Sequence, residues 1–166
     1  MKNDHIDTIL AQWRNERPDI DPSPMGVIGR MLRLDKIFIT KIQKLHAEYG
    51  LNVGEFDLLA TLLRSGPSYA LTPKQLLATL MLTSGAMTNR IDRLETKKYI
   101  QRSADPDDRR GVLVSLTING RKLIDAAISE HVNKEKQLLD ALSKNEQKTL
   151  SLLLKKVLLK HETEQD

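Results

Sequence analysis

The sequence predicts a mainly helical fold with a small β-hairpin, and two patterns between residues 71 and 120 predict it. Thr72, Pro73 and Gln75 have the spacing of a capping box with a proline at the first helical position, and a second helix follows after only a few residues. Beyond residue 99 the apolar period changes from helical to alternating, which predicts a β-hairpin. Two tightly joined helices followed by a hairpin make up a winged helix-turn-helix.

Three helices are predicted before this motif. A short amphipathic helix spans residues 6–13 and is followed by a polar, proline-rich connector at residues 14–24. A long helix spans residues 25–49, where Gly50 stops it, and a third spans residues 53–64. We expect residues 1–50 to serve dimerisation and to form a ligand pocket.

The second helix of the helix-turn-helix pair begins at Thr83 or Ser84 and has two different faces. A core stripe recurs at helical spacing and comprises Met87, Ile91, Leu94 and the stem of Lys98. The opposite face carries Gly85, Ala86, Asn89, Arg93, Thr96 and Lys97. Asn89 and Arg93 suit base edges or phosphates of duplex DNA, and Ser84 and Thr88 suit phosphate oxygens. The alternative is an ordinary amphipathic helix with a solvated face.

A charged turn at residues 105–111 links the two expected strands, about residues 100–103 and 112–116. Its two arginines, Arg109 and Arg110, suit the narrow, electronegative minor groove, although such a turn is also typical of a solvated loop. Ten basic against five acidic residues between Lys74 and Lys122 give this stretch a net charge of +5, while the whole chain carries +4. The positive charge is therefore concentrated where DNA would bind.

Two helices are predicted after the hairpin, and residues 51–120 and 121–166 are expected to form the DNA-binding and C-terminal dimerisation parts of one compact unit. Thr117 can cap a helix through Leu142, and Ser143 with Glu146 forms a capping box for a last helix to about residue 161. Leucines cover more than one face of the last helix, so it needs a partner, either in a homodimer or within a monomer.

The run DPDDRRGVLVSLT after SGAMTNRIDRLETKKYI resembles the wing and recognition helix of MarR-type bacterial transcription regulators. The resemblance extends over nearly the whole chain. It implies that Asp108 orients Arg110 into the minor groove, with Arg109 as a neighbouring candidate. It also implies a homodimeric regulator, expected to be a repressor, that binds a pseudo-palindromic operator with half-sites about 10 bp apart.

The segment QWRNERPDIDPSPMGVIGRM, together with Trp13, Asp57, Arg64 and Arg90, resembles the PecS-like, urate-responsive branch of this family. The resemblance implies that Trp13, Asp57 and Arg64 contact urate or a related aromatic anion, and that Arg90 on the recognition helix relays its binding. An aromatic ring can stack on a purine and an arginine can pair with anionic oxygens. The alternatives are a packing role for Trp13, and solvent exposure or interhelical ion pairs for Asp57 and Arg64. Arg90 can reach phosphate or pair inward.

Composition excludes several other classes of protein. The absence of cysteine excludes disulfides, thiol catalysis and cysteine-based oxidation sensing. Four dispersed histidines, with no glycine-rich phosphate loop and no nucleophile motif, predict no enzyme, no cofactor and no metal site. No signal peptide or long apolar run is present, so we expect a cytoplasmic protein without membrane contact. The alternatives are a regulator that responds to a phenolic compound or to a metal bound near His46 or His131, and a helical interaction protein.

Overall fold

The computed structural model describes residues 2–81, 83–106, 108 and 111–162. The chain divides into two compact units, Met1–Gly50 and Leu51–Asp166. The predicted minor-groove residues Arg109 and Arg110 lie outside the described residues.

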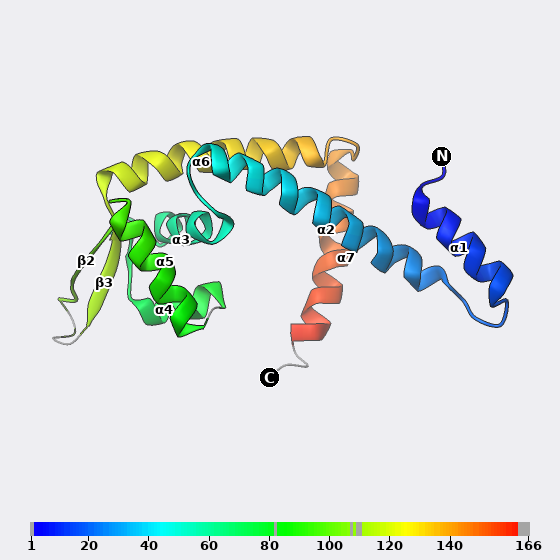
Figure 1. Ribbon diagram of the computed structural model, residues 1–166, viewed down its shortest axis with the longest axis horizontal. Helices are drawn as coiled ribbons and strands as arrows, with labels where there is room; N and C mark the ends of the chain where they lie inside the picture. The colour runs from blue at the N-terminus through cyan, green and yellow to red at the C-terminus, as the bar shows by residue number, and fades with distance from the viewer. Residues whose placement is uncertain (1, 82, 107, 109–110, 163–166) are drawn as a thin grey trace. The chain divides into compact units, whose positions relative to one another are not determined.

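The N-terminal unit consists of helices α1 (His5–Glu16) and α2 (Ser23–Glu48), which lie side by side (Figure 1). Asp4 and Asp7 form a capping box at the start of α1, and Gly50 follows α2 with a φ of +66°. Both carboxylates also accept hydrogen bonds from the Arg30 guanidinium on α2. Large apolar side chains remain exposed on α2, namely Met25, Val27, Ile28, Met31, Leu32, Leu34, Ile37 and Ile39.

The C-terminal unit places three helices around a common core: α3 (Val53–Arg64), α4 (Pro73–Leu80) and α5 (Ser84–Thr96). The predicted capping box of α4 is present, because the Gln75 amide donates to the Thr72 hydroxyl and the Thr72 amide donates to the Gln75 side chain. The core contains side chains from all three helices and the wing, with Leu58, Leu59, Leu62, Leu76, Leu94 and Val114 fully buried.

A three-stranded antiparallel sheet completes this unit: β1 (Ala70–Leu71), β2 (Ile100–Ala104) and β3 (Val112–Leu116) in the order β1-β3-β2. The hairpin of β2 and β3 projects from the body formed by α3, α4 and α5 (Figure 1). The structure therefore confirms a mainly helical winged helix-turn-helix. It adds the strand β1, which pairs with Val114 and Ser115 and which the sequence did not predict.

Helix α6 (Ile118–Leu138) begins at the predicted cap Thr117, whose hydroxyl accepts from the Gly120 amide. Gly120 lies so close to the carbonyl of Tyr99 that a Cβ there would be 1.8 Å from it, so only glycine fits. The helix ends four residues before the predicted Leu142. Helix α7 (Lys144–Glu162) begins with the predicted capping box of Ser143 and Glu146.

Helix α7 has no buried side chain. Its exposed apolar residues are Leu150, Leu152, Leu153, Leu154, Val157, Leu158 and Leu159. Over the part of the chain that the structure describes, no helix is both long enough and apolar enough to cross a membrane.

Candidate nucleic-acid interface and effector site

Helix α5 is amphipathic because its apolar residues recur at the helical period. Met87, Ile91 and Leu94 are at most 2% exposed and fix the helix against the core. Thr83 is its N-cap, although the threonine side chain makes no capping hydrogen bond within the described residues. The first backbone N–H groups of α5 are thus left for another acceptor, as in helices whose N-termini receive phosphate.

The outward face of α5 carries the predicted DNA-contacting residues, all of them exposed: Ser84, Thr88, Asn89 and Arg93. Within the described residues, the side chains of Asn89 and Arg93 make no hydrogen bond or ion pair, so their donors face solvent. The Thr88 hydroxyl donates to the carbonyl of Ser84 at 3.1 Å, and it would exchange this hydrogen bond to donate to a phosphate oxygen. The arrangement suits a groove surface that offers acceptors at base edges and phosphates.

The two lysines after this face have other roles than the sequence predicted. Lys98 was expected to pack its stem in the core, but α5 ends at Thr96 and Lys98 lies beyond it, exposed, with a φ of +60°. Lys97 was assigned to the outward face, but its ammonium pairs with the buried carboxylate of Glu55 on α3, at 2.8 Å from both oxygens. Neither prediction holds.

Arg102 on β2 joins the wing to α5. Its guanidinium donates to Asp92 and to Glu95, two acidic residues on the C-terminal half of the helix. Lys97 pairs with Glu55, which lies outside the stretch counted above, so the net positive charge available to DNA is smaller than that count by one; the pairing of Arg102 with Asp92 and Glu95 leaves it unchanged, because both acids were already counted. In the described residues it is carried on α5 by Arg93 and beyond its end by Lys98.

Asp108 at the wing tip was predicted to orient Arg110 into the minor groove. Of these two residues the structure describes Asp108, which is exposed. Its carbonyl accepts from the Gly111 amide at 2.8 Å, and the Asp105 amide donates to the Gly111 carbonyl at 3.0 Å. These two hydrogen bonds close the turn at the end of the hairpin.

Arg90 has the inward of the two orientations that the sequence left open. Its guanidinium lies against Gly54 at the start of α3, where a Cβ would be 2.4 Å from Cζ of Arg90. The one hydrogen bond of this contact is long, 3.5 Å from the guanidinium to the Gly54 carbonyl. Arg90 therefore links the recognition helix to α3 by close packing and a weak hydrogen bond.

Asp57 is the titratable group with unusual surroundings in this region. Burial raises the pKa of the Asp57 carboxyl above its ordinary value, while the nearby positive charges of Arg90 and Arg64 act in the opposite direction and offset only part of this effect. A half-buried carboxylate whose cost of burial is only partly offset by nearby positive charges is typical of functional sites. Three of the four predicted effector residues, Asp57, Arg64 and Arg90, are thus close enough to interact electrostatically.

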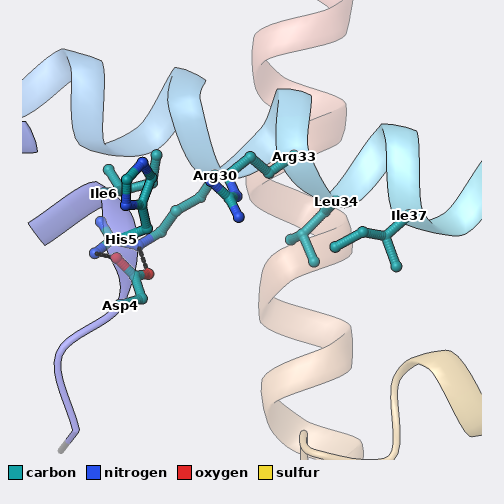
Figure 2. A pocket seen from close by; sticks show the side chains of 7 residues that line it. All are labelled: Asp4, His5, Ile6, Arg30, Arg33, Leu34 and Ile37. Atoms are coloured by element: carbon teal, nitrogen blue, oxygen red, sulfur yellow. Dashed lines mark hydrogen bonds and ion pairs between the residues drawn. The ribbon is translucent and has the colours of Figure 1, made fainter.

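The fourth predicted effector residue, Trp13, belongs to the N-terminal unit and is 39% exposed. That unit has a surface pocket of about 240 Å³ lined by Asp4, His5, Ile6, Arg30, Arg33, Leu34 and Ile37 (Figure 2). None of the four predicted effector residues lines this pocket. In Figure 2, Arg30 reaches toward Asp4, so Arg33 is the arginine at the pocket that has no carboxylate partner among the described residues.

Two residues of α3 that contact α5, Gly54 and Glu55, were not predicted from the sequence. A local signal existed for Glu55, because Asn52 and Glu55 have capping-box spacing and form that box. The same carboxylate is also the partner of Lys97, 42 residues further along the chain.

Comparison with known proteins places this geometry in a family. The family model described as "MarR family" matches residues 49–111. HTH-type transcriptional regulator PecS of Dickeya dadantii is 40% identical over 152 residues, which cover 92% of each chain. A mutant MarR from E. coli, solved in complex with operator DNA, superimposes with a TM-score of 0.69 at 26% identity, over 88% of this chain and 97% of that one.

A further solved structure, AbsC from Streptomyces coelicolor, superimposes with a TM-score of 0.78 over 87% of this chain and 97% of that one. At 18% identity this likeness concerns the fold alone. The similarity to PecS extends over nearly the full length of both chains and includes the helix-turn-helix, the wing and the flanking helices. The chain belongs to the MarR family of DNA-binding transcriptional regulators.

Proposed function

We propose that the chain is a cytoplasmic repressor that binds a pseudo-palindromic operator as a homodimer and is released by a small anionic aromatic ligand such as urate. The observation that carries the proposal is that α5 has two faces with different surroundings. Asn89 and Arg93 on its outward face have no hydrogen-bond partner among the described residues, while Arg90 turns inward to α3 and interacts with Asp57. One helix thus joins a DNA-facing surface to a charged internal site.

The outward face of α5 supports operator binding, and so does the E. coli MarR structure, which was solved with operator DNA. We infer that Asn89 and Arg93 contact base edges or phosphates, that Ser84 and Thr88 contact phosphates, and that Asp108 positions Arg110 or Arg109 in the minor groove. An interface made in this way releases counterions, so its affinity should fall steeply with salt.

Exposed apolar helices support a homodimer. Helix α7 presents leucines on more than one face, and α2 presents a second apolar surface. Surfaces of this kind mark interaction sites, because isolated monomers seldom expose large apolar patches. We infer that residues 1–50 and 121–166 dimerise and that residues 51–120 bind DNA. Two-fold symmetry would then place two copies of α5 in successive major grooves.

The charged site around Asp57 supports an anionic effector. Arg64 and Arg90 provide cations for anionic oxygens, the Asp57 carboxyl can accept N–H groups, and the exposed Trp13 ring can stack on a planar ligand. The binding of an anion near Arg90 would compete with the present contacts of its guanidinium. A coupling of about 1 to 3 kcal/mol is enough to change operator affinity roughly five- to 150-fold.

The test is a titration of urate into the protein bound to a fluorescent duplex from upstream of its own gene, at fixed salt. Urate should release the wild type, whereas the triple variant Trp13→Phe, Asp57→Asn and Arg64→Ala should stay bound. Equal release of the two proteins would contradict the assigned effector site. Release by a phenolic acid but not by urate would contradict urate as the ligand, and a monomer in sedimentation at micromolar concentration would contradict the homodimer.

A further inference from the structure

Helix α5 is held firmly at its C-terminal end. Both Glu55 oxygens lie 2.8 Å from the Lys97 ammonium, and one of them also accepts the Asn52 amide at 3.0 Å. The Glu55 side chain is 3% exposed, so the carboxylate of this charge-assisted contact is shielded from water, while the Lys97 side chain is partly exposed. Arg102 on β2 adds hydrogen bonds to Asp92 and Glu95 on the same half of the helix.

The contact between Arg90 and α3 is weaker than the ion pair at Lys97. Its guanidinium occupies the space where a Cβ of residue 54 would lie, and its one hydrogen bond to α3 within the described residues is 3.5 Å long. The packing is possible only because position 54 has no side chain, since a Cβ would approach Arg90 Cζ to 2.4 Å and Nε to 2.5 Å. A long hydrogen bond made by the end of a flexible side chain is easily exchanged for another.

We propose that the first turn of α3 positions α5 at two points, a fixed one at Glu55 and a releasable one at Gly54, and that Gly54 is the residue that makes release possible. Arg90 and Lys97 are seven residues apart, which places them on one side of α5 and about 10 Å apart along its axis. Their partners are neighbours in the sequence. Loss of the Gly54 contact therefore leaves α5 held at Lys97 and by its buried apolar side chains, and removes one restraint on the N-terminal half that carries Ser84, Thr88 and Asn89.

The inference rests on the proposed function for the identity of the signal, but the two-point hold itself does not depend on it. Asp57 is three residues from Gly54, one helical turn along α3, and it interacts electrostatically with Arg90. An anion bound by Arg90 would draw the guanidinium away from Gly54. The first turn of α3 would in this way convert ligand binding into a tilt of α5.

The test is Gly54→Ala, measured first without ligand. Alanine is a better helix former than glycine, so α3 should persist, and the new Cβ meets only the movable end of an arginine. We expect unchanged or higher thermal stability, together with operator affinity at least about fivefold weaker, which is the lower bound of typical allosteric couplings. Urate should lower the operator affinity of this variant by a smaller factor than it lowers that of the wild type.

Arg90→Met provides the second arm. It should weaken operator binding to a similar extent. The double variant should bind no more weakly than the more affected single variant, because both substitutions remove the same contact. The dependence of log affinity on log salt should be unchanged in Arg90→Met. If Arg90 instead contacted phosphate, its loss would reduce that slope by about one, and Gly54→Ala would bind as well as the wild type or better. Those results would overturn the inference.

The outcomes separate the two proposals. If urate fails to release the wild type but Gly54→Ala still weakens binding, the effector assignment fails and the two-point hold stands. If urate releases the wild type and Gly54→Ala binds with wild-type affinity, the two-point hold fails alone.

Discussion

Replacing Lys97 with methionine should lower the stability of the winged domain, because the substitution removes the cation that pairs with a buried carboxylate. Methionine keeps most of the apolar stem and loses the ammonium that lies 2.8 Å from both oxygens of Glu55. The Glu55 side chain is 3% exposed, so water cannot fully replace the lost partner. Both carboxylate oxygens lose the ammonium, and within the described residues Oε2 alone retains a hydrogen bond, from the Asn52 amide.

The expected magnitude follows from this partial burial. Breaking a fully buried ion pair costs about 3 to 5 kcal/mol, and a single hydrogen bond to a charged group contributes about 1.5 to 3 kcal/mol. The Lys97 side chain is 37% exposed, so the lower range applies. For a chain of this size about 1 kcal/mol shifts the Tm by about 2 to 4 °C, and the expected decrease is therefore about 3 to 12 °C.

The assay is thermal unfolding followed by circular dichroism, at one protein concentration for all variants, because the Tm of a protein that self-associates depends on its concentration. Lys98→Met is the matched control, since it removes the same charge from the adjacent position, where the exposed side chain has no partner among the described residues. The double variant Glu55→Gln with Lys97→Met should recover part of the loss, because no charge is then left buried. Equal Tm values for Lys97→Met and Lys98→Met would refute the assigned role of the pair.

Three further predictions concern single residues. Arg93→Met should weaken operator binding by about 1 to 3 kcal/mol in an anisotropy titration, and binding at wild-type strength would contradict its place at the interface. The pKa of Asp57 is raised in the folded state, so its charged form opposes folding as the pH rises above the unfolded value of 3.8. Asp57→Asn should therefore raise the Tm at pH 7 and have no such effect below about pH 4. A lower Tm of this variant at pH 7 would contradict the burial of the carboxyl. The Arg30 hydrogen bond lowers the pKa of Asp4 to about 2, so the ion pair stabilises the fold above pH 3.8 and this stabilisation is lost as the pH falls toward 2. Trp13 fluorescence, which reports on α1, should change in that pH range, and Arg30→Met should shift the change to higher pH. Coincident curves for the two proteins would exclude the contact.

Local patterns in the sequence were sufficient for most of the fold. The capping boxes at Thr72 and Ser143 are confirmed, because such a box involves residues only three positions apart. Helix α3 has the predicted bounds, since an N-cap and a terminal glycine define its ends. Membership of the MarR family, whose regulators are non-enzymatic, confirms the prediction that the chain is not an enzyme.

Contacts between distant residues account for the differences. Strand β1 has two residues and owes its existence to pairing with β3, more than 40 positions later, so no local period indicated it. The sequence placed Lys97 and Lys98 by extending the period of α5, but the helix ends at Thr96 and the chain turns through a residue of positive φ. The inward orientation of Arg90 depends on the packing of α5 against Gly54, which a helical wheel cannot represent.

The most direct test of the account is a hydroxyl-radical footprint of the protein on the DNA upstream of its gene. A homodimer that reads DNA with two copies of α5 should protect two symmetric patches on one face of the duplex, with half-site centres about 10 bp apart. Arg93→Met should weaken both patches together. A single unpaired patch, or protection without a symmetric partner at that spacing, would contradict the account.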